Sequence, residues 1–285
     1  MQQEKISNLL QDSNRLNRHF LKVIFEKQKA EQIFTSENYN FYDASSVLFL
    51  IGYNRSNKNR FSSEPCIILN KRSSLVGQPG DLCFPGGSIK PRLDLFLKKL
   101  LYLPFSPLTK WHCWSFWKNK CLKEADKLAF LLATSLRESF EEMRLNPMAV
   151  NFLGPISAEY LQTSNKMIYP MVCWVSGQKK FFPNWEVEKI LYIPIYEFFN
   201  KQNYYRFKID IDPEVQKQFD NLEIDHPCFI CKTDNQTDLL WGATYRIIAS
   251  FLELAFKFKM PDIELLPFTT ENINRKYFSI NKKNS

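Results

Sequence analysis

The pattern of hydrophobic and polar positions predicts a helix at each end of the chain. Apolar side chains recur at roughly helical spacing through residues 5–35, and again through 241–258. The first stripe consists of Ile6, Leu9, Leu10, Leu16, Phe20, Ile24 and Phe25. Such a helix can cover the main domain or bind a partner. Stripes of this kind usually face a core, which favours the cover.

Between these helices, compact apolar runs predict short strands. They fall at residues 43–52, 66–69, 81–84, 152–155, 169–175, 190–195, 207–209 and 228–230. A strong helix is predicted for 128–145, ended by Asn146-Pro147. This irregular mixture predicts an α+β or α/β fold, in which helices flank a mixed sheet as an α/β/α sandwich. We expect an N-terminal extension (1–40), a main domain (41–260) and a tail (261–285).

Residues 88–128 interrupt the main domain with a segment rich in aromatic residues and lysines. The segment is too apolar for a linker. It can form an aromatic lid over a substrate's apolar tail, a patch that meets a membrane surface or a partner, or an extra subdomain packed on the core. We favour the packed subdomain.

The overall composition fits a folded protein with anionic ligands. Hydrophobic residues make up 45% of the chain and aromatic residues 15%, enough for a substantial core. The net charge of +8 favours phosphorylated small molecules, and because it is spread along the chain we expect no DNA binding. An odd number of cysteines (seven), no visible signal peptide and no long apolar stretch predict a cytoplasmic protein with reduced thiols and no transmembrane segment.

The predicted helix at 128–145 carries the candidate chemistry. Glu138, Glu141 and Glu142 stand at i, i+3 and i+4, so they share one face and repel one another. The opposite stripe is largely apolar, with Leu132, Leu136, Phe140 and Met143 and with Ser139 among them. A bound divalent cation would remove the repulsion, and hard carboxylate oxygens suit Mg²⁺ or Mn²⁺. Arg137 can hold one carboxylate in place. The alternative is a solvated acidic face.

The string around these glutamates resembles the box of the Nudix hydrolase family, Gly-x5-Glu-x7-Arg-Glu-U-x-Glu-Glu-x-Gly-U, where U is aliphatic. Arg137-Glu138, Glu141-Glu142 and Leu145 match its second half, and Gly87 matches its first glycine. The resemblance implies a pyrophosphohydrolase in which the three glutamates and the backbone at Gly86 bind Mg²⁺ or Mn²⁺. It also implies that Arg137, Glu138, Glu141 and Glu142 form the catalytic set.

The chain departs from the box in three places. Ser139 takes an aliphatic position, and Arg144 replaces the glycine that ends the helix. In addition, 49 residues separate Gly87 from Arg137, where the box has 13. Counting back from Arg137 puts Ala129 at the position of the middle glutamate, so Glu124 or Asp126 is considered as its replacement.

Flanking strings resemble the coenzyme A pyrophosphatase branch of that family. They are Lys71-Arg72-Ser73, Phe84-Pro85-Gly86-Gly87 and Trp241-Gly242-Ala243-Thr244. This resemblance implies cleavage of coenzyme A or an acyl-coenzyme A into adenosine 3′,5′-bisphosphate and phosphopantetheine. Lys71, Arg72, Gly87 and Trp241 would then bind the substrate. Without the resemblance, Lys71 and Arg72 can equally be a solvated strand end, and Trp241 can be a core residue.

Two other functions stay open. The chain can hydrolyse another nucleoside diphosphate derivative, such as ADP-ribose, NADH or capped RNA. It can also be a binding module of this fold without catalysis, because the box is interrupted. Measured Mg²⁺ binding would separate these two, whereas the sequence leaves the substrate and the oligomeric state undetermined.

Overall fold

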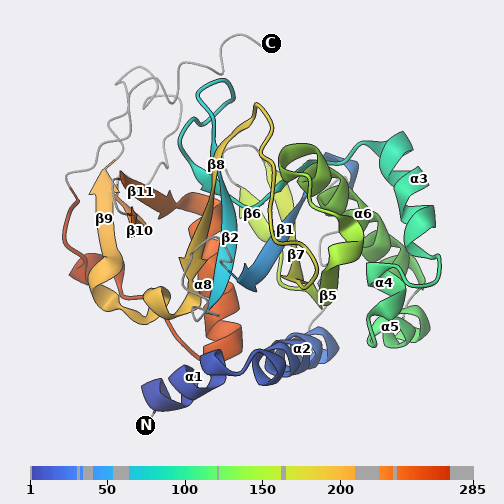
Figure 1. Ribbon diagram of the computed structural model, residues 1–285, viewed down its shortest axis with the longest axis horizontal. Helices are drawn as coiled ribbons and strands as arrows, with labels where there is room; N and C mark the ends of the chain where they lie inside the picture. Colours follow the sequence, from blue (N-terminus) through green and yellow to red (C-terminus); the bar gives the residue numbers. More distant parts are fainter. Residues whose placement is uncertain are drawn as a thin grey trace.

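The computed structural model describes residues 2–30, 33–34, 41–53, 64–120, 122–161, 165–208, 225–233 and 236–269 (Figure 1). Its helices are α1 (Gln2–Gln11), α2 (Ser13–Ala30), α3 (Pro91–Leu101), α4 (Pro107–Lys110), α5 (Trp114–Lys120), α6 (Leu122–Met143) and α8 (Gly242–Phe256). Short 3-10 turns lie at Phe41–Asp43, Pro147–Ala149, Ile195–Phe199, Lys201–Asn203 and Ile263–Leu265. Much of the predicted tail, 270–285, lies outside the described residues, as do parts of the N-terminal extension.

A mixed sheet forms the centre of the molecule. Its strands are β1 (Ser45–Tyr53), β2 (Pro65–Arg72), β3 (Leu82–Cys83), β4 (Gly86–Ser88), β5 (Val150–Pro155), β6 (Glu159–Leu161), β7 (Lys166–Val175) and β8 (Val187–Pro194). The main path runs β3-β2-β1-β7-β5, while β4, β6 and β8 pair with β1, β7 and β2. β1 and β7 are parallel, and the other pairs are antiparallel.

Helices cover both faces of this sheet. Along β1, Phe49 and Ile51 join a core with α2 and α8, while Leu48 and Leu50 join a second core with α6. This alternation follows from the two-residue period of a strand. On the α8 side, the rings of Phe49 and Phe251 lie 4.6 Å apart. The predicted α/β/α sandwich with a mixed sheet is therefore confirmed.

The N-terminal helix is a cover, as expected, although it is broken in two. Asp12 separates α1 from α2, and its Oδ1 accepts hydrogen bonds from the backbone N–H groups of Asn14 and Arg15. Leu16 and Phe20 on α2 are fully buried against the sheet and α8. Their burial removes this face from any partner.

The aromatic segment packs on the core as a subdomain of its own helices. In Figure 1 the helices α3, α4 and α5 lie beside α6 on one flank of the sheet. Trp111 and Trp117 are buried in the same core as α6, and the Trp117 indole N–H donates to Gln28 Oε1 of α2 at 3.0 Å. The favoured interpretation of residues 88–128 therefore agrees with the structure.

Two details of the predicted elements are wrong. Helix α6 begins at Leu122, six residues before the expected start, and so takes in the end of the aromatic segment. Phe140 is 47% exposed, although it was placed on the buried stripe; Ser139, fully buried, takes that place. Because Ser139 Oγ donates to the Ser135 carbonyl at 2.7 Å, a small polar residue is accommodated in the core.

A second, smaller sheet was not anticipated. It consists of β9 (Tyr204–Lys208), β10 (Asp225–Thr233) and β11 (Gln236–Trp241) in the order β11-β10-β9. β11 leads directly into α8, which places this sheet beside the turn before β3. Within the described residues, no helix combines the length and the apolar character needed to cross a bilayer.

Candidate active site

A glycine pair brings the Pro-Gly-Gly turn into contact with α6. Gly86 pairs with Val47 of β1 at a φ of +155°, and a Cβ there would lie 2.5 Å from the Ser46 carbonyl oxygen. A Cβ on Gly87 would lie 2.8 Å from the carboxyl carbon of Glu138. At Gly86 the close atoms belong to the backbone of β1, so glycine is required there for β4 to fit. At Gly87 the close atom is the end of the Glu138 side chain, which a larger residue would displace. The long segment between Gly87 and Arg137 thus leaves turn and helix adjacent.

Arg137 is held by a carboxylate that the sequence analysis did not single out. Asp94 of α3 has no exposed surface, and its two oxygens accept from Arg137 Nε at 2.6 Å and Nη2 at 3.2 Å. The Thr134 hydroxyl donates to Asp94 Oδ2 at 2.9 Å. Arg137 Nη1 also donates to Glu138 Oε1 at 2.6 Å, and Nη2 to the Ser88 carbonyl at 3.1 Å. Arg137 therefore ties the glutamate helix to both α3 and β4.

The burial of Arg137 acts on its charge in two opposing ways. Desolvation alone would lower the pKa of the guanidinium. The hydrogen bonds to Asp94 and Glu138 outweigh desolvation and raise the pKa above its ordinary value. Arg137 is therefore a permanent cation that fixes the rotamer of Glu138.

A forward count along the box would have found Asp94. Counted from Gly87, the acidic position of the box falls on Leu93, one residue before Asp94. Counted backward from Arg137 it falls on Ala129, which is buried in the core. The additional residues therefore follow Asp94 and do not precede it.

Neither acidic residue suggested as a replacement lies at the site. Asp126 accepts hydrogen bonds from Lys98 Nζ at 2.6 Å and from the Tyr102 hydroxyl at 3.2 Å. It stands twelve residues before Glu138 on one continuous helix, roughly 18 Å along the axis. Glu124 is half a turn farther away. Both therefore lie far from Glu138 along the helix, whereas Asp94 contacts Arg137 directly.

Glu142 is the most buried of the three glutamates. Asn70 Nδ2 of β2 donates to its Oε2 at 2.8 Å, and the Gly86 N–H lies 3.5 Å from its Oε1. Burial, reinforced by repulsion from Glu138, raises the pKa of Glu142 from 4.5 to about 8, although both hydrogen bonds act in the other direction. The charge of Glu142 is thus only partly compensated by its neighbours.

A small cavity of about 110 Å³ lies beside Glu142. Its lining residues are Asn70, Arg72, Val76, Cys83, Glu142, Glu186 and Val187. Asn70 Oδ1 is buried and, within the described part of the chain, accepts no hydrogen bond. The cavity therefore combines a carboxylate with a free amide oxygen, and both are oxygen donors suited to a hard cation.

Glu138 and Glu141 have cationic neighbours. Glu138 is 13% exposed and bound to Arg137, whereas Glu141 is 39% exposed and receives Lys90 Nζ at 3.0 Å. Glu138 and Glu141 therefore share Arg137 and Lys90 as cationic neighbours, whereas Glu142 turns toward Asn70 and Gly86. Across the residues that the structure describes, no three His, Cys, Asp or Glu side chains converge closely enough to hold a metal ion.

The residues suggested for substrate binding lie in two places. Arg72 lines the cavity beside Glu142, and its Nε donates to the Gly77 carbonyl at 2.7 Å. Lys71 instead pairs with Asp238 of β11 at 3.0 Å and with Glu188 at 3.2 Å. Desolvation would lower the pKa of Lys71, but these contacts raise it. Lys71 is thus engaged in joining the two sheets.

Trp241 is also held by contacts within the protein. Its Nε1 donates to Asp81 Oδ1 at 3.0 Å, and its ring meets the ring of Phe207 edge-on at 5.2 Å. Because Asp81 also accepts the Arg72 backbone N–H through its carbonyl at 2.9 Å, Trp241 supports the turn that carries the cavity wall. Its contacts are those of a structural residue at the start of α8.

Comparison with known proteins gives only distant likenesses. No protein-family model and no curated protein matches the sequence. Among solved structures, a Nudix hydrolase from Alicyclobacillus acidocaldarius is 12% identical with a TM-score of 0.36, over 77% of this chain and 98% of the other. The Nudix domain of Shewanella oneidensis NrtR, complexed with ADP ribose, is 13% identical with a TM-score of 0.33, over 61% and 85%. The Ap4A hydrolase from C. elegans is 9% identical with a TM-score of 0.32, over 53% of this chain and 79% of the other. At these values the likenesses decide neither activity nor substrate.

Proposed function

We propose that this chain is a pyrophosphohydrolase of the Nudix type that depends on Mg²⁺ or Mn²⁺. The observation that carries the proposal is the close approach of Gly87 to Glu138, since a Cβ at Gly87 would lie 2.8 Å from the Glu138 carboxyl carbon. This approach assembles the two halves of the interrupted box. Together with the buried Arg137–Asp94 pair, it gives the glutamates of α6 a fixed position beside the Pro-Gly-Gly turn.

The donor chemistry fits a hard divalent cation. Glu142 is buried with an incompletely compensated charge, and the neighbouring Asn70 oxygen is an unused acceptor among the described residues. Glu138 and Glu141 would complete the set, with the Gly86 backbone nearby. The side chain of Lys90 is 54% exposed and pairs with Glu141 at the surface, so a divalent cation can displace it. When bound, Mg²⁺ neutralises phosphate charge and lowers the pKa of a coordinated water.

The residues of the chain have distinct roles in this proposal. Arg137, locked by Asp94, holds Glu138 in one rotamer, and Asn70 orients Glu142. Glu142 lies beside the cavity, where a carboxylate can accept a proton from the attacking water. Arg72, on the wall of the same cavity, is placed to attract a phosphate oxygen.

The proposed substrate is coenzyme A or an acyl-coenzyme A, cleaved to adenosine 3′,5′-bisphosphate and phosphopantetheine. Support comes from the Lys71-Arg72-Ser73 and Phe84-Pro85-Gly86-Gly87 strings. The position of Arg72 beside Glu142 agrees with it, whereas the engaged Lys71 and Trp241 add nothing to it. ADP-ribose, NADH and capped RNA are the alternative substrates of the same chemistry.

A specific observation favours a second candidate, a binding module without catalysis. Glu138 and Glu141 are paired with Arg137 and Lys90, Glu142 contacts Asn70, and the three do not form a metal-binding group within the described residues. If the cationic contacts of Glu138 and Glu141 persist when Mg²⁺ is supplied, the fold would present a diphosphate cleft without a metal.

The test is product analysis with purified protein and Mg²⁺ or Mn²⁺. The panel contains coenzyme A, an acyl-coenzyme A, ADP-ribose, NADH and capped RNA, with Glu142→Gln as the matched control. Cleavage of coenzyme A that the control loses supports the full proposal. Cleavage of another compound keeps the chemistry and discards the substrate. Absence of both turnover and Mg²⁺ binding in calorimetry overturns the proposal in favour of the binding module.

A further inference from the structure

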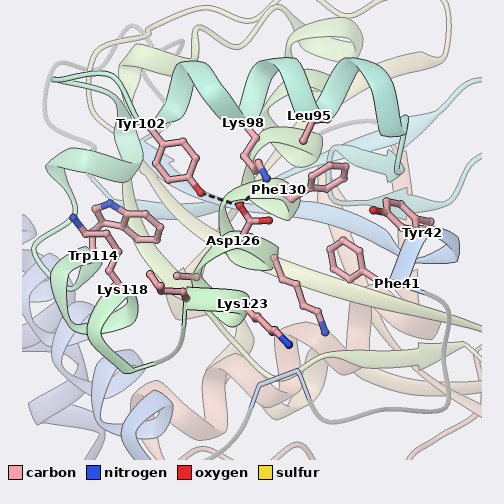
Figure 2. Close-up of a pocket in the computed structure, with 13 residues that line it drawn as sticks. Phe41, Tyr42, Leu95, Lys98, Tyr102, Trp114, Lys118, Lys123, Asp126 and Phe130 are labelled. Atoms are coloured by element: carbon pink, nitrogen blue, oxygen red, sulfur yellow. Dashed lines mark hydrogen bonds and ion pairs between the residues drawn. The ribbon is translucent and has the colours of Figure 1, made fainter.

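A second, larger cavity lies at the opposite end of α6 from the glutamates. It measures about 710 Å³, within the range of small-molecule sites, and we call it the lysine pocket (Figure 2). Its lining residues are Phe41, Tyr42, Leu95, Lys98, Tyr102, Trp114, Lys118, Leu122, Lys123, Ala125, Asp126, Lys127 and Phe130. The proposed catalytic chemistry uses none of them.

Aromatic rings form much of the lining of the lysine pocket. Phe130 and Trp114 are almost fully buried, whereas Tyr42 and Tyr102 are 57% and 41% exposed. Figure 2 shows Phe41 and Tyr42 on one side of the pocket and Tyr102 and Trp114 on the other. Rings that expose their faces or edges at a cavity offer stacking surfaces to a planar ligand.

Lysines surround these rings and give the pocket a positive charge. Lys98 is committed to Asp126 at 2.6 Å. Lys118, Lys123 and Lys127 are exposed, and within the described residues none of the three has a carboxylate partner. Lys123 and Lys127 stand at i and i+4 on α6, so they share one face. Four lysines against one aspartate leave a net charge of +3 on the lining.

The surrounding segment has the same bias. Residues 88–128 contain nine basic and three acidic residues, so +6 of the chain's net charge of +8 lies in this one segment. Such a concentration of charge around a cavity attracts anions from solution. The occupant must therefore be anionic and must also have a flat, apolar part.

One carboxylate in the lysine pocket narrows the chemical class of the occupant further. Asp126 Oδ1 already accepts from Lys98 and Tyr102, and the side chain is 55% exposed at the centre of the view in Figure 2. Its free oxygen can accept a hydrogen bond from a sugar hydroxyl or an amino group. A planar ring, a hydroxylated or amino-bearing middle and a negative end together describe a nucleoside phosphate.

We propose that the lysine pocket is a binding site for a nucleoside phosphate, separate from the glutamate site. The base would stack on the aromatic rings, Asp126 would accept from the base or the ribose, and Lys118, Lys123 and Lys127 would bind the phosphates. Asp126 and Glu138 are roughly 18 Å apart along α6, so one nucleotide in the pocket leaves the glutamate site free. This proposal stands without the proposed function.

The test is calorimetric titration of the full chain with three separate probes. ATP is the complete ligand, adenosine represents its base and ribose, and tripolyphosphate represents its phosphates. EDTA is included to remove divalent cations from the glutamate site. ATP is expected to bind at least tenfold more tightly than either half, because only ATP engages both the rings and the lysines. Absence of ATP binding, or equal binding of tripolyphosphate, overturns the proposal.

Variants locate the binding. Lys123→Gln/Lys127→Gln is expected to weaken ATP binding about tenfold or more, since it removes two charge-assisted hydrogen bonds to the phosphates. Lys99→Gln/Lys110→Gln removes the same charge from the same segment outside the pocket and should change the affinity less than about threefold. Equal losses in the two variants would reduce the effect to general charge and overturn the site.

Two more variants separate the two ends of α6. Tyr42→Ala removes an exposed ring and should weaken ATP about fivefold or more, as expected for a lost stacking partner. Glu142→Gln should leave ATP affinity unchanged. If Glu142→Gln abolishes ATP binding while Lys123→Gln/Lys127→Gln does not, the nucleotide occupies the glutamate site and the lysine pocket is not its site.

Discussion

Helices α3 and α6 are joined by two ion pairs of opposite polarity. At the glutamate end, Asp94 of α3 pairs with Arg137 of α6, and their side chains are 0% and 4% exposed. At the other end, Lys98 of α3 pairs with Asp126 of α6, whose side chain is 55% exposed. The first pair is therefore fully enclosed, whereas in the second only Asp126 reaches solvent, because the side chain of Lys98 is 10% exposed.

This difference in burial fixes the side chains at one end of α6 and leaves Asp126 free to move at the other. An enclosed pair is costly to break, since the remaining charge stays buried, whereas an exposed pair contributes little because water screens it. The glutamate end is thus held rigidly by Asp94, while at the lysine pocket Asp126 can change partners. Rigid placement suits the precise geometry of catalysis, and an open carboxylate suits binding.

The largest expected effect is on the rate at the glutamate end. Glu142→Gln should lower the proposed pyrophosphohydrolase activity by about two to four orders of magnitude, because the variant loses both a cation ligand and a proton acceptor. The fold should persist, since an amide oxygen still accepts from Asn70. Steady-state kinetics with Mg²⁺ measure the loss. Near-normal turnover with the substrate that the wild type cleaves would remove α6 from the mechanism.

The next effect compares the two pairs directly. Asp94→Asn should lower the free energy of unfolding by about 3–5 kcal/mol, since it removes the carboxylate that holds two nitrogens of the buried Arg137 and leaves only Glu138 and Glu141 to offset its charge. Asp126→Asn should cost less, about 1–2 kcal/mol, since Asp126 is 55% exposed although its partner Lys98 is only 10% exposed. Urea unfolding followed by circular dichroism measures both. Equal losses would show that burial does not distinguish the two ends.

A smaller effect concerns pH. Because the folded pKa of Glu142 is raised from 4.5 to about 8, the folded state keeps a proton that the unfolded state releases. Stability should therefore fall as the pH rises between about 4.5 and 8, by roughly 5–10 °C in the Tm of the metal-free protein. Glu142→Gln should flatten this decline when Tm is measured in EDTA from pH 5 to pH 8.5. An unchanged slope in the variant would assign the decline to other groups.

The smallest expected effect concerns the stability contributed by Lys71, which shares its partner Asp238 with Lys189. Lys71→Met should cost only about 1–2 kcal/mol, because Asp238 retains Lys189 at 2.8 Å. In the proposed reaction Lys71→Met should leave KM nearly unchanged, whereas Arg72→Met, on the cavity wall beside Glu142, should raise KM about tenfold. The reverse order of KM values would return Lys71 to the substrate site.

The sequence predicted the fold and the glutamate helix because their signals are local. The period of β1 and the spacing of Glu138, Glu141 and Glu142 lie within single elements. Asp94 and Asn70 were missed because their roles arise from contacts with residues 43 and 72 positions away. The lysine pocket was missed for the same reason, since its lining comes from separate segments of the chain.

The break at Asp12 and the small sheet of β9, β10 and β11 differ in how far the sequence reveals them. Asp12 divides the N-terminal helix through a local cap that sequence inspection can find, but the small sheet depends on pairing across residues 209–224. Phe140 was misplaced because helical period alone does not say how wide the buried face is. Ser139 fills that face through its bond to Ser135.

Asp94 also determines where the chain can be cut and rejoined. A protein engineer who wished to restore the ordinary spacing of the box would delete the extra residues between Gly87 and Arg137. A deletion beginning before Asp94 would remove the fully buried carboxylate that pairs with Arg137 and leave it with Glu138 and Glu141, whereas one beginning after Asp94 would keep that carboxylate. The boundary of a removable module therefore lies inside α3, beyond its first turn. A graft of residues 95–128 onto another protein would not carry Asp94, the residue that holds Arg137 of α6.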